Sequence, residues 1–349
     1  MLKLIFAPLS LIYGFVIWIR NFLFDKQIFK TNNFNVPVIS IGNLTMGGTG
    51  KTPTVQYLTE LLTEIGYKPG VVSRGYGRKT KGTVIVNNGL DTISTPELAG
   101  DEPVLLSNHL QNIPIIVDEN RANGIDEMIN QFLVNVILLD DAFQHRSVHR
   151  DLDIVLLDAT EDKENYKLLP LGRLREPISN IKRADIVIHT RVQGDAGPKT
   201  TDVIRKHTNS PQLQSKFAPS ILKYYYDIGF QKEKKTHHTV FAFCGIGNPE
   251  SFYRFVDNSD IDCGGKYSFK DHQEYNIKTV EFLKNKMVEN NCDALLTTEK
   301  DIIKLPQELL KTTPVYVIKI QLEMNEDQIQ ILKQHIKTLF KSSKSKSIE

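Results

Sequence analysis

The chain has 349 residues, which is long enough for two or three domains of ordinary size. A composition of 40% hydrophobic and 24% charged residues excludes both a disordered chain and a polytopic membrane protein. The formal net charge of +2 gives no reason to expect a nucleic-acid partner. The three cysteines, Cys244, Cys263 and Cys292, form no C-x-x-C pair, so they favour a reducing compartment over a disulfide framework or a zinc site.

The first predicted element is the uncharged, mostly apolar run LIFAPLSLIYGFVIWI at residues 4–19. As a helix at ~1.5 Å per residue this run would reach roughly 24 Å, short of a hydrocarbon core of about 30 Å. We therefore predict a membrane-associated helix over residues 1–26, an anchor in one leaflet rather than a span. A signal peptide is disfavoured because no small-residue cleavage site follows the run. A buried core helix is the remaining alternative.

From residue 27 to about 225, short apolar runs rich in β-branched residues alternate with helical patterns. The segment TPTVQYLTELLTEIG at residues 52–66 has a helical pattern. One face of this predicted helix carries Val55, Leu58, Leu61, Leu62 and Ile65, as a helix packed on a sheet requires. The strand-like runs are apolar throughout instead of alternating, which is typical of a parallel sheet covered on both faces. These patterns predict an α/β/α sandwich with a mostly parallel sheet.

A polar stretch over residues 192–235 predicts a domain boundary. A second, smaller α/β domain is predicted over residues 236–349, beginning with TVFAFC and closing near PVYVIKI. The final segment, KSSKSKSIE at residues 341–349, is a basic, serine-rich tail for which we expect disorder.

The segment GNLTMGGTGKT between a predicted strand and a predicted helix indicates a phosphate-binding loop, with Thr45 where the general G-x-x-x-x-G-K-[ST] pattern has glycine. Its glycines let backbone N–H groups face phosphate oxygens at the positive end of a helix. Lys51 would reach the β- and γ-phosphates, and Thr52 offers a hydroxyl for Mg²⁺. The predicted ATP-binding residues are Thr45, Met46, Gly47, Gly48, Thr49, Gly50, Lys51 and Thr52. The alternative is a glycine-rich turn without a ligand.

Acidic and basic residues follow other predicted strands. Asp140 and Asp141 end the strand in VNVILLDD, a position from which phosphate-loop enzymes present a carboxylate to Mg²⁺, although a solvated turn is the simpler explanation for either one. Arginines lie near the ends of other predicted strands, namely Arg74, Arg78, Arg121, Arg173 and Arg175. Glu176 follows the last of them directly. Arginines gathered at one sheet edge favour an anionic substrate, while each alone fits a surface ion pair.

Spacing alone assigns no catalytic role to three further groups. Asp101 and Glu102 fit helix-start carboxylates. His272 is a lone histidine, and Thr298 and Asp301 have capping-box-like spacing.

The motifs IGNLTMGGTGKTP, SRGYGR, GDEP, VDENR, LLDDAFQHR, LGRLREP, FCGIGNP, FKDHQEY and LLTTEKD, in this order, resemble those of the tetraacyldisaccharide 4'-kinase family. The resemblance implies a P-loop NTPase-like fold and Mg²⁺-dependent transfer of the ATP γ-phosphoryl group to the 4'-hydroxyl of tetraacyldisaccharide 1-phosphate, a lipid A precursor. It also implies action at the cytoplasmic face of the bacterial inner membrane. Thr45 belongs to the family's own loop, so its departure from the general pattern is no objection.

The resemblance further implies that Asp101 accepts the proton of the sugar hydroxyl and that His272 orients or tunes this carboxylate. The metal-side residues it implies are Thr52 and Asp140 or Asp141. Site residues toward the substrate would be Arg74, Arg78, Glu102, Arg121, Gln144, Arg175 and Glu176. Two rivals stay open at this point: a membrane-peripheral P-loop ATPase or nucleotide switch, whose relatives often carry lysine where this chain has Met46, and a binding module for another anion. The sequence does not specify the oligomeric state.

Overall fold

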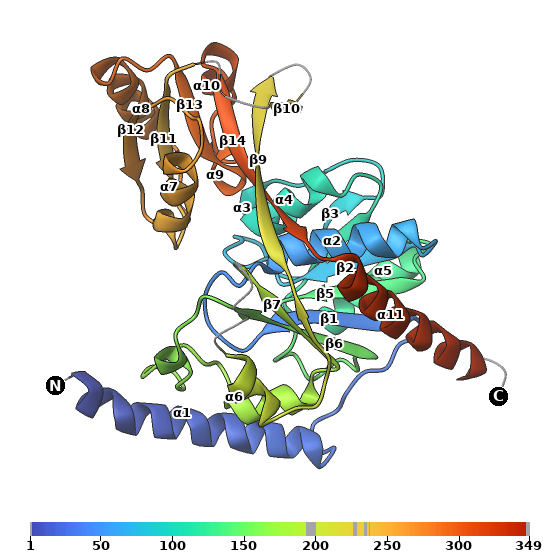
Figure 1. The fold of residues 1–349 in the computed structure, drawn as a ribbon. Helices are drawn as coiled ribbons and strands as arrows, with labels where there is room; N and C mark the ends of the chain where they lie inside the picture. The colour runs from blue at the N-terminus through green and yellow to red at the C-terminus, as the bar shows by residue number, and fades with distance from the viewer. Residues whose placement is uncertain (1, 193–199, 226–228, 234–235, 237, 347–349) are drawn as a thin grey trace. The chain divides into compact units, whose positions relative to one another are not determined.

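The computed structural model describes residues 2–192, 200–225, 229–233, 236 and 238–346. The chain forms two compact units (Figure 1). Unit 1 comprises Met1–Phe217 and Leu322–Glu349, and unit 2 comprises Ala218–Gln321.

Unit 1 is built on an 8-stranded sheet with the strand order β3-β4-β2-β5-β1-β6-β7-β8. The strands are β1 (Val38–Asn43), β2 (Pro69–Ser73), β3 (Val84–Asn88), β4 (Pro114–Val117), β5 (Val136–Asp140), β6 (Leu152–Asp158), β7 (Ile186–Thr190) and β8 (Gln212–Gln214). All neighbouring strands are parallel except β3, which runs antiparallel to β4. The parallel strands therefore bring their carboxyl ends to one edge of the sheet, where ligands bind in open α/β folds.

Helices cover both faces of this sheet. The helical segments within residues 51–205 are α2 (Lys51–Glu64), α3 (Pro96–Ala99), α4 (Asp101–His109), α5 (Arg121–Gln131), η1 (Lys163–Asn165), η2 (Ile178–Arg183) and α6 (Thr201–Arg205). Along β1, Ile39 joins the core cluster that contains α2 and α4, whereas its neighbour Val38 joins the cluster that contains α5. This alternation confirms the predicted α/β/α sandwich.

The C-terminal helix α11 (Glu326–Lys346) belongs to unit 1, although the prediction placed residues 236–349 together in the smaller domain. Leu332, Ile336 and Leu339 of α11 lie in the same core cluster as α2, and Phe340 stacks on Tyr67. Disorder was expected for residues 341–349, but α11 continues through Lys346. Residues 347–349 lie outside the described chain. The apolar stripe formed by Leu332, Ile336 and Leu339 is buried in the core of unit 1, which explains why α11 belongs to this unit.

Unit 2 contains most of a 6-stranded sheet with the order β10-β9-β14-β13-β11-β12. Its strands are β9 (Lys216–Tyr225), β10 (Gly229–Glu233), β11 (Val240–Cys244), β12 (Cys263–Ser268), β13 (Ala294–Thr298) and β14 (Val315–Glu323). Its helices are α7 (Pro249–Asp257), α8 (Ile277–Glu289), α9 (Glu299–Ile302) and α10 (Gln307–Thr312). One core cluster includes α8 and α10 and another includes α7, so this unit is also α/β.

The polar stretch that predicted a boundary contains α6, β8, β9 and β10. Apart from Leu213 in β8 and Ile221 in β9, the side chains described in these strands are exposed or half-buried, so the strands carry no long apolar run that the sequence could reveal. Residues 193–199, 226–228, 234–235 and 237 of this stretch lie outside the described chain.

The N-terminal helix α1 (Leu2–Asp25) is longer than the apolar run, and its 24 residues correspond to about 36 Å. Of the described helices it alone is long and apolar enough to cross a membrane, by length and composition, over Phe6–Asp25. Its exposed apolar side chains are Leu9, Leu11, Ile12, Phe15, Val16, Trp18, Ile19 and Phe22. Only 11% of the apolar window is buried, so the buried-core alternative was wrong.

Candidate active site

The glycine-rich loop connects β1 to α2 at the carboxyl edge of the unit 1 sheet. Gly47 and Gly50 have positive φ angles of 115° and 84°, a region that favours glycine. A Cβ added to Gly50 would lie 2.1 Å from the Phe217 ring, so a larger residue would need that ring to move. Gly50 is also the N-cap of α2 and has no side chain with which to cap it, so the first turn can offer its N–H groups to an anion.

Thr45 lies where this loop pairs with residues 173–175. It forms an antiparallel bridge with Leu174, while Met46 N donates to Arg173 O over 2.7 Å and Arg175 N donates to Leu44 O over 2.7 Å. This ladder holds the start of the loop in an extended conformation. Glycine is therefore not required at Thr45, which explains physically why the loop departs from the general pattern.

Lys51, Asp141 and Arg175 form an ion-pair group beside the loop. Lys51 Nζ lies 3.7 Å from Asp141 Oδ1, and Arg175 Nη1 donates to both Asp141 oxygens over 2.9 and 3.0 Å. Burial on its own would raise the pKa of Asp141, but Lys51 and Arg175 outweigh burial and hold this pKa below its usual range. Asp141 thus carries a charge that keeps two cations close to the phosphate-binding loop.

Asp140 has a different environment from its neighbour. It is buried, its Oδ2 accepts a 2.9 Å hydrogen bond from Ser73 Oγ, and its Oδ1 has no hydrogen-bond partner among the described residues. Burial, together with the negative charges of Glu102 and Asp141, raises the pKa of Asp140 to about 6. An oxygen that is buried, unpaired and close to other carboxylates fits a position facing a cation.

The donor set suits Mg²⁺ rather than a metal held by protein side chains alone. Within the described residues, no three His, Cys, Asp or Glu side chains gather closely enough to hold a metal ion. Mg²⁺ commonly keeps several waters and takes one or two carboxylates plus phosphate oxygens. Asp140 with its unpaired Oδ1, together with the Thr52 hydroxyl at the start of α2, fits that requirement.

Basic residues surround His145, which follows β5 in the loop that also contains Gln144. Burial and the charges of Arg121, Arg150, Arg20 and Arg74 lower the pKa of His145 to about 4. The imidazole is therefore neutral at physiological pH and hydrogen-bonds Ser147 Oγ over 3.0 Å. Sequence reasoning assigned no role to Arg20 or Arg150, since nothing in the sequence connects α1 with this loop.

The predicted substrate-side residues divide into two groups. Arg121 is buried, with Nη2 3.5 Å from Asp140 O, and Gln144 Nε2 donates to Asn43 O over 3.0 Å, so both lie beside the loop and the acidic pair. Arg74 is exposed and close enough to influence His145 and Arg121. Glu102 lies close enough to Asp140 to raise its pKa.

Arg78 and Glu176 are engaged elsewhere. Arg78 pairs with Glu119 and donates to Gly82 O and Val117 O, so it fixes the segment after β2. Glu176 is fully buried and accepts hydrogen bonds from Asn21, Asn180 and Arg183. These contacts hold both side chains within the protein, and the substrate contacts expected of them stay a prediction.

Three further residues, Arg173, Arg191 and Phe217, lie against the loop, and the last two were not singled out from the sequence. A Cβ on Gly47 would meet Arg173 Nη2 at 2.1 Å, so this guanidinium packs against the loop. Arg191 pairs with Asp158 and lies over the Phe217 ring at 5.4 Å. Arg191 follows β7 directly and has a φ of 58°, so a strand-end search could have found it. Phe217 lies in β9, next to the edge strand β10, in a segment without a motif.

The proposed catalytic pair is divided between the units. Asp101 is the first residue of α4 in unit 1, directly after Gly100, whose φ is 94°. His272 is in unit 2, with a φ of 57° and its N–H bonded to Gly245 O over 3.2 Å. Asp301 accepts from Gly245 N and Tyr275 OH, which fixes the loop beneath His272. The joint action of Asp101 and His272 stays a prediction.

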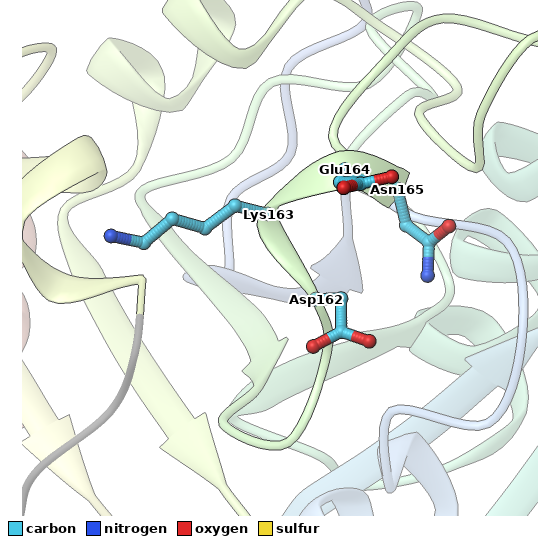
Figure 2. A pocket seen from close by; sticks show the side chains of 4 residues that line it. All are labelled: Asp162, Lys163, Glu164 and Asn165. Atoms are coloured by element: carbon cyan, nitrogen blue, oxygen red, sulfur yellow. The ribbon is translucent and has the colours of Figure 1, made fainter.

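A separate cavity of about 650 Å³ is lined by Asp162, Lys163, Glu164 and Asn165 (Figure 2). The four side chains point in different directions, and Lys163 extends away from Asp162 and Asn165 (Figure 2). None of the predicted site residues lines this cavity. It therefore has no convergent polar groups that would define a ligand site.

A glycine-rich loop between the first strand of a parallel sheet and its following helix, with an acidic residue at the end of a neighbouring strand, defines the class of P-loop nucleotide-binding proteins. Comparison with known proteins is more specific. The sequence model of the Tetraacyldisaccharide-1-P 4'-kinase family matches residues 2–337. The chain belongs to this family, which confirms the predicted family membership.

Individual relatives agree with this assignment. The Tetraacyldisaccharide 4'-kinase of Chlorobium phaeobacteroides is 35% identical over 336 residues, 93% of this chain and 94% of the relative. The one from Desulfotalea psychrophila is 36% identical over 305 residues, 85% of this chain and 86% of the relative. A crystal structure of the "apo" form of LpxK from Aquifex aeolicus in complex with ATP has a TM-score of 0.79 at 32% identity, covering 97% of this chain and 100% of that one.

Proposed function

We propose that this protein is a kinase that transfers the γ-phosphoryl group of ATP to the 4'-hydroxyl of a tetraacyldisaccharide 1-phosphate in lipid A biosynthesis. The observation that carries this proposal is the Lys51–Asp141–Arg175 group beside the phosphate loop, on a chain that matches the kinase family over residues 2–337. Phosphoryl transfer requires mainly positioning and neutralisation of charge, which such a group supplies.

The loop residues have defined tasks in this proposal. The backbone N–H groups around Gly47–Gly50 hold the phosphates of ATP, and Lys51 neutralises charge on the β- and γ-phosphates. Asp141 keeps Lys51 and Arg175 in place, because it pairs with both. Arg175 can then present its remaining N–H groups to the transferring phosphate.

Mg²⁺ at this site would supply positive charge to the phosphates of ATP. Thr52 and Asp140 are the residues proposed to hold it. The unpaired Oδ1 of Asp140 supports this choice over Asp141, whose two oxygens are already paired with Arg175. Because a ligating carboxylate must be ionised, the raised pKa of Asp140 makes metal binding weaker at acidic pH.

Asp101 is proposed to accept the proton of the attacking hydroxyl, with His272 orienting or tuning this carboxylate, as the family resemblance implies. The position of Asp101 in the first turn of α4 gives it the support of the helix dipole. Arg74 and Arg121 are proposed to hold anionic groups of the lipid. Neutral His145 can donate or accept a hydrogen bond there without adding charge.

The exposed apolar face of α1 supports binding of the protein to a membrane that contains the lipid substrate. Contacts from Ser10 to Asp25 join α1 to the body of unit 1, and this favours a helix that lies along the membrane surface. The proposed location is the cytoplasmic face of the bacterial inner membrane, where ATP is available.

The deciding experiment is transfer of ³²P from γ-labelled ATP to the tetraacylated disaccharide 1-phosphate in detergent micelles. We expect labelled lipid with the wild type and at least a roughly 100-fold slower reaction with Lys51→Met, because charge neutralisation is lost. Folded protein that binds ATP and yields no labelled lipid would exclude the kinase function. Rapid ATP hydrolysis without lipid would instead favour a nucleotide switch.

A further inference from the structure

We infer that α1 is also a structural component of the nucleotide site, in which Tyr13 and Arg20 are positioning residues for the phosphate loop and its ion-pair group. The inference rests on the proposed function for its significance, but it concerns contacts within unit 1 alone. It implies that seating of α1 against the body and binding of ATP strengthen one another.

The first connection runs from Arg20 to the loop. Arg20 Nη2 donates to the backbone oxygen of Gln144. The side-chain amide of the same Gln144 donates to Asn43 O over 3.0 Å at the end of β1. Asn43 Nδ2 in turn donates to Thr49 Oγ1 over 3.0 Å inside the phosphate loop. Asn43 and Thr49 are buried, so this connection is shielded from competing water.

The second connection runs from Tyr13 to Lys51. Tyr13 OH donates to the backbone oxygen of Arg175 over 2.7 Å. The side chain of Arg175 holds Asp141, which lies 3.7 Å from Lys51 Nζ. The Arg175 backbone N–H also bonds Leu44 at the start of the loop. Movement of Tyr13 would therefore displace both the loop entrance and the residue that orients Lys51.

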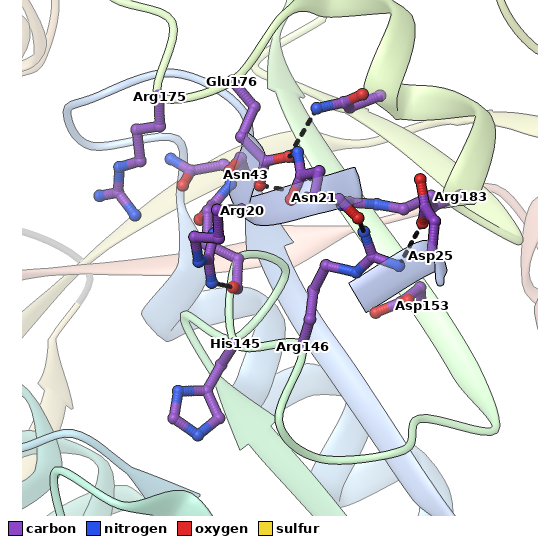
Figure 3. Close-up of polar contacts among 12 residues, drawn as sticks. Arg20, Asn21, Asp25, Asn43, His145, Arg146, Asp153, Arg175, Glu176 and Arg183 are labelled. Atoms are coloured by element: carbon purple, nitrogen blue, oxygen red, sulfur yellow. Dashed lines mark hydrogen bonds and ion pairs between the residues drawn. The ribbon is translucent and has the colours of Figure 1, made fainter. Parts of the chain in front are cut away.

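A third set of contacts seats α1 without reaching the loop. Asn21 Nδ2 donates to the buried carboxylate of Glu176 over 3.0 Å, and Arg146 pairs with Asp25 over 2.6 Å at the end of α1. Figure 3 shows Asn21 of α1 bonded to Glu176 and Asp25 of the same helix paired with Arg146. The polar side of α1 is thus built into the site, while its apolar side is exposed.

Membrane anchoring alone does not require the polar side chains of α1 to bond to residues of the nucleotide site. An anchor needs only an apolar face and can be joined to its domain by a flexible link. Here Tyr13 and Arg20 bond to backbone oxygens of Arg175 and Gln144, two residues whose side chains reach the loop. Because coupling between two sites is reciprocal, ATP should then stabilise the seated position of α1 to the same extent that α1 favours ATP.

The test uses the full chain in dodecyl maltoside micelles and measures ATP affinity by displacement of a fluorescent analogue. We expect Tyr13→Phe and Arg20→Met each to weaken ATP binding about 3- to 10-fold, the effect of losing one hydrogen bond. Arg20→Lys keeps a donor and should give an intermediate value. Asp25→Asn is the matched control, because it removes a contact of α1 that does not lead to the loop, and it should change ATP affinity less than about 2-fold.

Hydrogen exchange of α1 amides provides the reciprocal measurement. Saturating ATP should slow exchange in α1 of the wild type and leave it unchanged in Arg20→Met. The inference is overturned if ATP leaves wild-type α1 unaffected, or if Asp25→Asn weakens ATP binding as much as Arg20→Met does. Failure of the proposed function is a separate result, namely normal ATP binding and slowed exchange without any labelled lipid product.

Discussion

The carboxylate of Asp140 combines a functional position with an energetic cost. Its pKa is about 6 in the folded protein and near 3.9 in an unfolded chain, a difference that corresponds to ~3 kcal/mol. Between these two values the folded state binds more protons than the unfolded state. Wild-type stability therefore rises as the pH falls from about 6 toward 4, and this contribution is lost as the pH rises through 6.

Asp140→Asn removes this titration, which gives a prediction at the scale of one residue. Relative to the variant, the wild type should gain stability as the pH falls from 7.5 to 4.5, while the variant loses kinase activity at all pH values. Urea unfolding without nucleotide or metal measures the effect. Asp126→Asn, at an exposed aspartate of α5, serves as control and should run parallel to the wild type. Parallel curves for Asp140→Asn would contradict the assigned cause of the shift.

Single residues also mark how far sequence reasoning reaches into the site. The loop glycines, Lys51 and the Asp140–Asp141 pair were predicted from the sequence because a strand end and a helix start fix their neighbourhood. Arg78 and Glu176 could not be separated from Arg175 by sequence, since all are charged residues in loops. Their roles depend on distant partners, Glu119 for Arg78 and Asn21 for Glu176, which no local pattern announces.

At the scale of elements, the two glycines that flank α2, Gly50 in the phosphate loop and Gly66 after the helix, are expected to respond differently to substitution. Gly50→Ala would place a methyl group against the Phe217 ring at a positive φ, and the loop would have to shift. A shift of this size should lower kcat/KM about 100-fold. Gly66→Ala has a similar φ of 91° but no atom within 4 Å, so it should cost roughly 1–2 kcal/mol of stability and leave the kinetics near wild type. Equal kinetic losses would refute the steric argument.

The helix α1 yields a second prediction at this scale. Phe15 is 60% exposed on the apolar face, and its transfer into lipid should contribute about 2 kcal/mol. Phe15→Glu should therefore reduce co-sedimentation with phosphatidylethanolamine and phosphatidylglycerol vesicles at least ~30-fold. Leu133→Glu, at a 90% exposed leucine outside α1, introduces the same charge and should leave sedimentation unchanged. If both variants sediment like the wild type, α1 does not bind the membrane through this face.

For the molecule as a whole, the order of segments along the sequence predicts only in part which unit each segment belongs to. Alternating apolar runs identified both α/β units, because burial on two faces leaves a strong local signal. The return of residues 322–349 to unit 1 left no such signal. The amphipathic stripe of α11 specifies that the helix packs on something, but Leu332 and Ile336 do not encode which core receives them.

This return predicts that a substitution near the C-terminus destabilises the unit that contains the N-terminus. Ile336 is fully buried in the core cluster of unit 1, so Ile336→Ala should cost about 2–5 kcal/mol. Ile331 of the same helix is 36% exposed, and Ile331→Ala should cost much less. Hydrogen exchange can follow the two units separately. Exchange should become faster for the β1, β5 and β6 amides in Ile336→Ala, whereas the β11 and β13 amides of unit 2 keep wild-type rates. Faster exchange confined to unit 2 would contradict the packing of α11 on the core of unit 1. Faster exchange in both units would mean that they unfold together.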